Sequence, residues 1–281
     1  MTSAARHRAP SGTVWAAWSA LADLVLPRGC GGCARPGAGW CPVCAQALSG
    51  APTRRVLDAG LVVWSAARYE DPVRSAVVRW KDRGRADLCR PLAVGLRRAA
   101  AAALREASGS LLPAAGRASE RSPHPAGDPA ADLARDLARD LARDLAADLA
   151  APLALVPMPS SRRSRRARGH EPVRDLARTA ASGLRRRGLP VMVLPVLRQS
   201  GGVADQAGLG SAERQRNLAG ALVVRPGWRP RLDARPVLLV DDVVTTGSTL
   251  TEARRVLVEA GAVVLGAATV ASTPLHRSHR K

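Results

Sequence analysis

The sequence predicts an α/β protein with a mainly parallel β-sheet flanked by helices, preceded by a small cysteine-rich module. Three observations support this fold class. In the second half of the chain, short apolar and β-branched runs alternate with helical patterns, which is typical of parallel strands joined by helices. A length of 281 residues suits one sizeable core with small attachments. Four of the five cysteines lie between positions 30 and 44.

The first residues are predicted to form a short amphipathic helix. Val14, Trp18 and Leu21 repeat at helical spacing, while Asp23 interrupts the apolar run. No small-residue cleavage site follows that run, so we favour a helix over an export signal. The protein is therefore expected to be cytoplasmic.

Two Cys-x-x-Cys pairs, Cys30 with Cys33 and Cys41 with Cys44, are separated by seven residues rich in Gly and Pro. Such spacing lets four thiolates converge on one zinc ion, and four ligands leave no open position, so the zinc would be structural. The alternatives are two disulfides or reduced, unliganded thiols. A reducing compartment disfavours the disulfides. Cys89 stands apart and is predicted to be a small buried residue.

After this module, residues 61–69 are predicted to form a strand. Asp71 and Pro72 suit the start of a helix that ends at Gly84. A second helix is predicted over 86–105.

The segment 106–150 is predicted to be a low-complexity insertion. Its first part, 106–130, is rich in Ser, Pro, Gly and Ala and is expected to be disordered. The repeat Asp-Leu-Ala-Arg then runs over 132–143 and favours a helix. This helix could bind a partner or be a repeat expansion in a tolerant loop, and we favour the expansion because long surface insertions cost little free energy.

The remaining chain is predicted to form the core of the sheet. Strands are predicted over 153–157, 191–197, 236–240 and 262–270, and helices over 171–187 and 248–260. Ligands of such sheets bind at the carboxyl ends of the strands.

A buried strand, two acids and a Thr/Gly/Ser turn follow one another directly before a helix, between positions 237 and 249. Gly247 permits a tight turn whose N–H groups can converge on one anion at the helix N-terminus. The carboxylates of Asp241 and Asp242 would instead accept hydrogen bonds from ribose hydroxyls. The alternative is an ordinary capped helix, which explains one polar residue but not this whole set. The predicted phosphate-binding residues are Thr245, Thr246, Gly247, Ser248 and Thr249.

This segment resembles the phosphoribosyl-pyrophosphate (PRPP) motif of type I phosphoribosyltransferases. Over about residues 15–100 and 150–275, the chain is similar to the ComF family (competence protein F, amidophosphoribosyltransferase-like). The resemblance implies a type I phosphoribosyltransferase-like fold. It also implies that the turn holds the 5′-phosphate and that Asp241 and Asp242, the predicted catalytic residues, hold the ribose hydroxyls.

A second anion loop follows the strand at 153–157 and is dense in Arg, whose guanidinium groups grip pyrophosphate oxygens. It resembles the family's pyrophosphate loop. Relatives typically have Arg-Gly-Phe-Asn-Gln where this chain has Arg168-Gly169-His170-Glu171-Pro172. The residues that carry the PRPP-binding prediction here are Arg162, Arg163 and Arg168, and those that fit the family's flexible hood loop are Gln206, Gly208, Leu209, Glu213, Arg214 and Asn217.

The resemblance implies phosphoribosyl transfer with pyrophosphate release and Mg²⁺ bound with the pyrophosphate. The alternative is a non-catalytic PRPP-binding module that acts with DNA or a helicase in DNA uptake. The net charge of +20 favours polyanion binding, but the absence of Phe argues against an aromatic platform for bases. No apolar stretch is long enough to span a bilayer. The predicted divisions are 1–50 (helix and four-Cys module), 51–105 (first part of the main domain), 106–150 (insertion), 151–275 (core) and 276–281 (basic tail).

Overall fold

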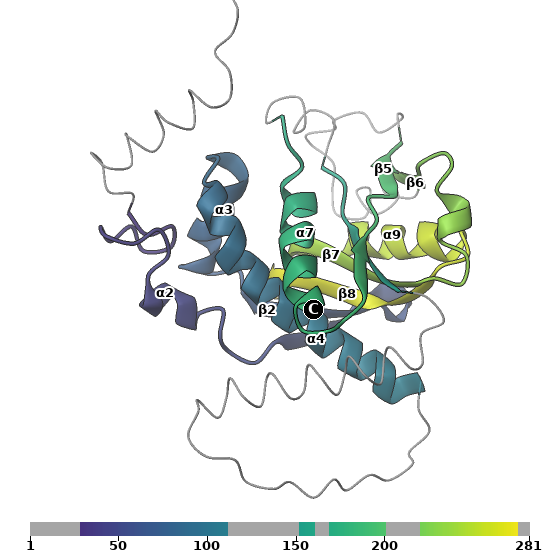
Figure 1. The fold of residues 1–281 in the computed structure, drawn as a ribbon, viewed down its shortest axis with the longest axis horizontal. Helices are drawn as coiled ribbons and strands as arrows, with labels where there is room; N and C mark the ends of the chain where they lie inside the picture. The colour runs from purple at the N-terminus through teal and green to yellow at the C-terminus, as the bar shows by residue number, and fades with distance from the viewer. Residues whose placement is uncertain (1–28, 112–151, 161–168, 201–219, 275–281) are drawn as a thin grey trace, which may run out of the picture.

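The computed structural model describes residues 29–111, 152–160, 169–200 and 220–274 (Figure 1). Several predicted features lie outside these ranges: the N-terminal amphipathic helix, the repeat at 132–143, Arg162, Arg163, Arg168 and the hood-loop residues between 206 and 217.

A six-stranded sheet forms the centre of the protein, with strand order β1-β2-β8-β7-β3-β4. All neighbouring strands are parallel except β1 and β2, which are antiparallel. The fold class predicted from the sequence is thus confirmed. The strands are β1 Thr53–Val56, β2 Val62–Arg68, β3 Leu153–Pro157, β4 Val191–Val193, β7 Pro236–Val244 and β8 Val263–Ser272.

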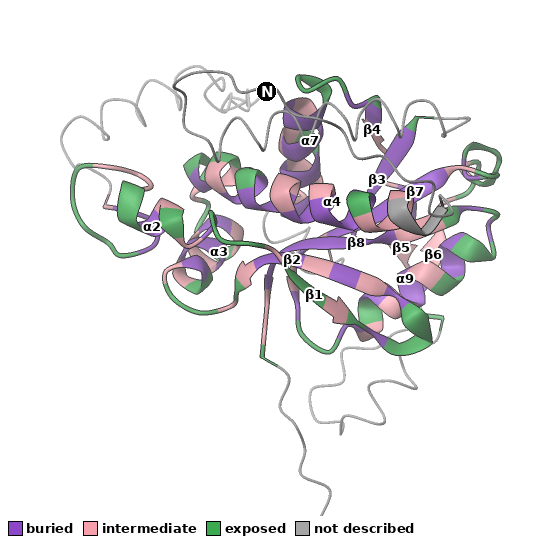
Figure 2. Cartoon of the chain, turned by 90° about the horizontal axis from the view of Figure 1, so that it is seen from below, coloured by how far each residue is buried: buried purple, intermediate pink, exposed green. Residues whose placement is uncertain are grey.

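Helices cover both faces of the sheet, and the central strands β8, β7 and β3 lie buried between them (Figure 2). Alternation along β7 decides the faces: Leu238 and Val240 pack toward α3, α4 and α7, whereas Val237 and Leu239 pack toward α9. In the described ranges, no helix combines the length and apolar character needed to cross a membrane. The helices are α2 Pro42–Gln46, α3 Val73–Asp82, α4 Cys89–Leu111, α7 Pro172–Arg185 and α9 Ser248–Val258, with 3-10 turns η1 Asp58–Gly60, η2 Ala86–Leu88 and η3 Arg229–Arg231.

The predicted strand over 191–197 is wrong in its extent, because the chain forms two short strands there. β4 ends at Val193, and β5 (Leu197–Gln199) pairs antiparallel with β6 (Leu222–Val224) in a separate two-stranded sheet. Pro195 lies between them and has no N–H to continue the ladder.

The predicted end of the second helix at residue 105 is also wrong, since α4 continues to Leu111. Glu106 connects this helix to the sheet. Its carboxylate forms a 2.7 Å ion pair with Arg54 and accepts a 2.8 Å hydrogen bond from the indole N–H of Trp64. At the start of α3, the first helical residue is Val73, and Asp71 accepts a 3.2 Å hydrogen bond from the backbone N–H of Ser75. Asp71 therefore caps the helix from one position earlier than a standard N-cap residue.

Candidate functional site

A cavity of about 470 Å³ opens at the carboxyl ends of β2, β3 and β7. This is the edge of a parallel sheet where ligands bind, and the volume falls in the range of small-molecule sites, which is about 300–1,000 Å³. Strand ends and strand-following loops supply one wall, and α3 supplies the other. The lining residues are Tyr69, Val77, Val78, Lys81, Asp82, Met158, Pro159, Ser160, Val173, Asp241, Asp242, Val243, Thr245 and Thr249.

The two predicted acids lie within β7, not beyond its end, because the strand continues to Val244. Asp241 pairs with Thr269 of β8 and is half-buried, whereas Asp242 is only 3% exposed. The backbone N–H of Asp242 donates a 2.8 Å hydrogen bond to Oδ1 of Asp241. Both acids line the same cavity.

Burial is the main cause of the shifted pKa of Asp241. Loss of solvation raises the pKa of this carboxyl well above its usual value, and the neighbouring charge of Asp242 raises it further. Lys81 acts in the opposite direction but does not reverse the shift. Ionising both carboxyl groups at once is therefore unfavourable, and a hydrogen-bond donor or a cation in the cavity would stabilise the doubly charged pair.

Sequence reasoning did not assign Lys81 to the site. It lies on α3, and its Nζ is 2.6 Å from Oδ2 of Asp242. A signal was present in the composition: among 43 Lys and Arg residues, the chain has only two lysines, Lys81 and Lys281. An ammonium group is a compact point charge, which suits a narrow approach to a carboxylate better than a planar guanidinium does.

The predicted phosphate turn leads directly into α9. Gly247 is the N-cap residue with φ of 84°, the left-handed region that glycine tolerates best. Thr245 and Thr249 line the cavity, while the hydroxyls of Thr246 and Ser248 are 3.0 Å apart on the turn itself. The structure thus brings the acids and the two ends of the turn to one cavity.

The chain beneath the turn was not predicted from the sequence. A Cβ atom on Gly247 would lie 2.2 Å from Cδ1 of Leu57, so the turn packs directly on that side chain. Arg55 of β1 donates a 2.7 Å hydrogen bond to the carbonyl oxygen of Thr245 and a second bond to that of Thr273. Burial lowers the pKa of the Arg55 guanidinium, which nevertheless stays charged at neutral pH.

The described part of the predicted pyrophosphate loop also reaches the cavity. Met158 and Ser160 line it, and the backbone N–H of Met158 bonds to the carbonyl of Val240 at 2.9 Å, which fixes the loop beside β7. Glu171, the unusual carboxylate near this loop, lies 3.5 Å from Arg174 and 3.9 Å from Arg225. Its charge is therefore directed to these arginines.

The chain on either side of residues 201–219 is held close together by a backbone hydrogen bond. The N–H of Ser200 donates to the carbonyl of Ala221 at 2.9 Å, and the N–H of Gly220 donates to Glu252 of α9 at 2.8 Å. Hydrogen bonds from Arg255 are the main cause of the lowered pKa of Glu252.

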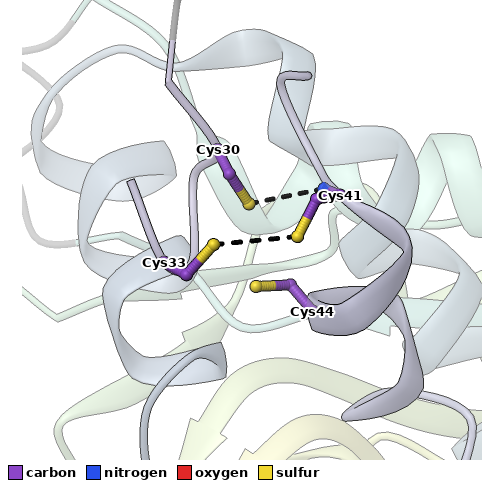
Figure 3. A group of neighbouring side chains, drawn as sticks. All are labelled: Cys30, Cys33, Cys41 and Cys44. Atoms are coloured by element: carbon purple, nitrogen blue, oxygen red, sulfur yellow. Dashed lines mark hydrogen bonds between the residues drawn. The ribbon is translucent and has the colours of Figure 1, made fainter. Parts of the chain in front are cut away.

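The four clustered cysteines fit a tetrahedral metal site. Their side chains point toward one another, and all four sulfur atoms lie within 4.8 Å of each other (Figure 3). The sulfurs of Cys33 and Cys41 are 3.7 Å apart. Sulfurs about 2.3 Å from a common zinc ion, in tetrahedral geometry, would be separated by about 3.8 Å. The thiols of Cys30 and Cys44 are buried, which suits a structural site.

Local hydrogen bonds prepare the first cysteine for metal binding. Burial raises the pKa of the Cys30 thiol, but hydrogen bonds from backbone N–H groups, foremost that of Cys41 at 3.3 Å, outweigh burial and bring it to about 6. Burial, together with hydrogen bonds to the neighbouring thiols, raises the pKa of Cys44. Cys89 contributes nothing to the cluster; it is partly buried, with its sulfur 3.5 Å from the hydroxyl of Thr179.

The cysteine cluster is fastened to the main domain through α3. Nη1 of Arg79 donates hydrogen bonds of 2.9 and 3.0 Å to the carbonyls of Cys30 and Gly31. A Cβ atom on Gly31 would lie 2.3 Å from the side chain of Leu88, so the cluster packs closely on η2. The cysteine cluster and Lys81 are thus attached to the same helix.

No known protein-family model matches this sequence, and no curated protein matches it either. A solved structure described as the allosteric regulatory enzyme of purine biosynthesis matches with 19% sequence identity and a TM-score of 0.28. The match covers 48% of this chain and 25% of that chain, so the protein spans about a quarter of the length of that enzyme. The fold itself, a mainly parallel sheet flanked by helices with a four-cysteine cluster beside it, rests on the strand pairing and packing described above.

Proposed function

We propose that the cavity binds PRPP and that the protein is a phosphoribosyltransferase-like member of the ComF family. In this proposal it transfers a phosphoribosyl group to an acceptor and releases pyrophosphate. One observation carries the proposal: a single cavity joins the acids of β7 to the glycine turn at the N-terminus of α9.

The two parts of this cavity suit two parts of PRPP. Asp241 and Asp242 offer acceptors to the 2′- and 3′-hydroxyls of ribose, and the raised pKa of Asp241 means that such donors would relieve an unfavourable charge. The turn from Thr245 to Thr249 offers hydroxyl donors and the N-terminus of an 11-residue helix to the 5′-phosphate.

The pyrophosphate group would extend toward the loop after β3. Met158 and Ser160 bring this loop to the cavity, and its arginines Arg162, Arg163 and Arg168 are proposed to bind the pyrophosphate oxygens. Mg²⁺ bound with PRPP would neutralise phosphate charge, and the oxygen ligands it prefers are available from the substrate, from water and from Asp241 or Asp242.

The proposed reaction is displacement at the anomeric carbon of ribose. The bond to the pyrophosphate oxygen breaks, its electron pair leaves with pyrophosphate, and the acceptor's lone pair forms the new bond to carbon. The protein's part is to fix the ribose by its hydroxyls and 5′-phosphate and to stabilise the charge of the leaving group. The zinc ion proposed at Cys30, Cys33, Cys41 and Cys44 has no open position for substrate and is assigned a structural role.

A second candidate is a PRPP-binding module without catalysis that acts with DNA or a helicase. The net charge of +20 favours this reading, as does the replacement of the family's Asn and Gln amides by Glu171 and Pro172. Both candidates require PRPP binding, so a titration of PRPP and an assay of pyrophosphate release across acceptors separate them. PRPP binding without pyrophosphate release in the presence of any acceptor tested supports the non-catalytic module, whereas pyrophosphate release supports the transferase.

A further inference from the structure

We infer that Arg55 is a positioning residue: from the edge strand β1, it holds the turn from Thr245 to Thr249 in the shape that receives a phosphate group. This inference rests on the proposed function. Arg55 is not among the residues that line the cavity, and its effect on the ligand is transmitted through the backbone of the turn.

Arg55 joins the carbonyl groups of two residues that follow neighbouring strands. Nη1 donates to the oxygen of Thr245, directly after β7, and Nη2 donates to the oxygen of Thr273, directly after β8. A guanidinium group is a planar fork with several N–H donors, so one side chain can hold two acceptors in a fixed relation. Arg55 thus ties the carboxyl ends of the two longest strands to β1.

The bond to Thr245 also orients the peptide group between Thr245 and Thr246. In a trans peptide the C=O and the following N–H point in opposite directions. Because the carbonyl of Thr245 is drawn toward Arg55, the N–H of Thr246 is directed away from β1. Arg55 therefore fixes the direction of a donor at the start of the turn, where N–H groups are available to an anion.

Side-chain packing beside this bond also supports the turn. Leu57, two residues after Arg55, lies on the same face of the chain and fills the space beneath Gly247, where a Cβ atom would come within 2.2 Å. The turn is thus supported at its first residue, Thr245, and at its middle residue, Gly247, from one short segment. A turn that is already ordered before binding loses less conformational entropy when the ligand arrives.

The neighbouring arginine provides a matched control. Arg54 points to the opposite face of β1, where it forms a 2.7 Å ion pair with Glu106 of α4. Arg54→Met and Arg55→Met remove the same group from adjacent positions of one strand, but only the second change touches the turn. Arg55→Lys retains the charge and loses the fork.

The test measures affinity and stability separately on the four proteins. Calorimetry with inorganic phosphate and with PRPP plus Mg²⁺ gives the affinities, and urea unfolding gives the stabilities. We expect Arg55→Met to bind both ligands about tenfold more weakly, equivalent to about 1.4 kcal/mol, with an intermediate loss in Arg55→Lys. Arg54→Met should bind as the wild type does, even where its stability falls.

Wild-type affinity in folded Arg55→Met would overturn the inference while leaving PRPP binding intact. Failure of the wild type to bind either ligand would instead contradict the proposed function. In that case, hydrogen exchange of the Thr246 and Gly247 amides still decides the role of Arg55: faster exchange is expected in Arg55→Met than in Arg54→Met, and equal rates would refute it. Arg55→Lys serves in every measurement if the methionine variant does not fold.

Discussion

Lys81 Nζ and Asp242 Oδ2, 2.6 Å apart, connect α3, the helix that binds the cysteine cluster through Arg79, to the acids of the cavity. The side chain of Asp242 is 4% exposed and that of Lys81 is 33% exposed, so the pair is partly shielded from water. Replacing Lys81 leaves two neighbouring carboxylates without this cation.

We predict that Lys81→Met lowers the free energy of unfolding by about 1–3 kcal/mol, because a buried carboxylate loses a charged partner. Urea unfolding at neutral pH measures this change. Arg68→Met is the control: its 3.8 Å pair with Glu70 is largely exposed and should contribute less than about 1 kcal/mol. Equal, small effects of the two substitutions would show that the Lys81 pair is no stronger than a surface pair.

The raised pKa of Asp241 predicts that its ionised carboxylate lowers the stability of the folded protein, although the same carboxylate is proposed to bind ribose. Protonated Asp241 favours the folded state; this contribution is complete below the unfolded pKa, near the usual value of 3.8, and is lost as pH rises through the higher folded pKa. Because Asn cannot ionise, the variant does not lose this contribution to stability as the pH rises. Asp241→Asn should therefore raise the thermal midpoint relative to the wild type more at pH 8 than at pH 4.

The same substitution should weaken PRPP binding about ten- to hundredfold at neutral pH, because charge-assisted hydrogen bonds to ribose are lost. Melting curves at the two pH values and one calorimetric titration are sufficient. A variant that is less stable than the wild type by the same margin at both pH values would contradict the assigned burial cost.

Gly247→Ala should strongly impair phosphate binding and destabilise the turn. The substitution meets two obstacles: a φ of 84°, which costs an L-residue about 1–2 kcal/mol, and the side chain of Leu57. Gly188→Ala separates them, since its φ is 85° but nothing lies within 4 Å of a Cβ atom there. We expect the larger loss of stability in Gly247→Ala, measured by urea unfolding; equal losses would mean that the Leu57 contact is unimportant.

The cysteine cluster should bind one zinc ion per chain, and Cys44→Ser should lose most of it. Zinc content is measured by elemental analysis of freshly purified, reduced protein. Because the cluster packs on α3 and η2, the thermal midpoint of Cys44→Ser should fall by about 4 °C or more. Cys89→Ser should retain its zinc, since its sulfur lies against Thr179 and outside the cluster. Full zinc content in Cys44→Ser would refute the four-ligand site.

The parallel strands and the glycine turn before α9 could be predicted because their signals are local. The segment of β7 is an apolar run that contains two acids near its end and leads into a glycine turn, and each part reports its own environment. β1 could not be predicted, because Thr53 to Val56 include two adjacent arginines and show no apolar alternation. It forms by antiparallel pairing with β2, and two contacts with distant residues hold it, namely Arg54 with Glu106 and Arg55 with Thr245.

The role of Lys81 was hidden for a related reason. The helical pattern predicts that Val77 and Trp80 face the core, and it therefore fixes the face of α3 on which Lys81 lies. The pattern does not show which strand end the side chain of Lys81 contacts. That meeting depends on how α3 packs beside β7, which the cysteine cluster helps to determine through Arg79. Tertiary packing of this kind leaves no signal in a local window of sequence.

Calorimetric titration of the wild-type protein with PRPP in the presence of Mg²⁺ tests the central claim most directly. We predict saturable binding of one PRPP per chain, weakened in Asp241→Asn and Asp242→Asn, with inorganic phosphate still bound by both variants and lost in Gly247→Ala. This pattern would place the ribose at the acids and the phosphate at the turn. Absence of any PRPP binding by folded, zinc-loaded wild-type protein at millimolar concentration would contradict the account.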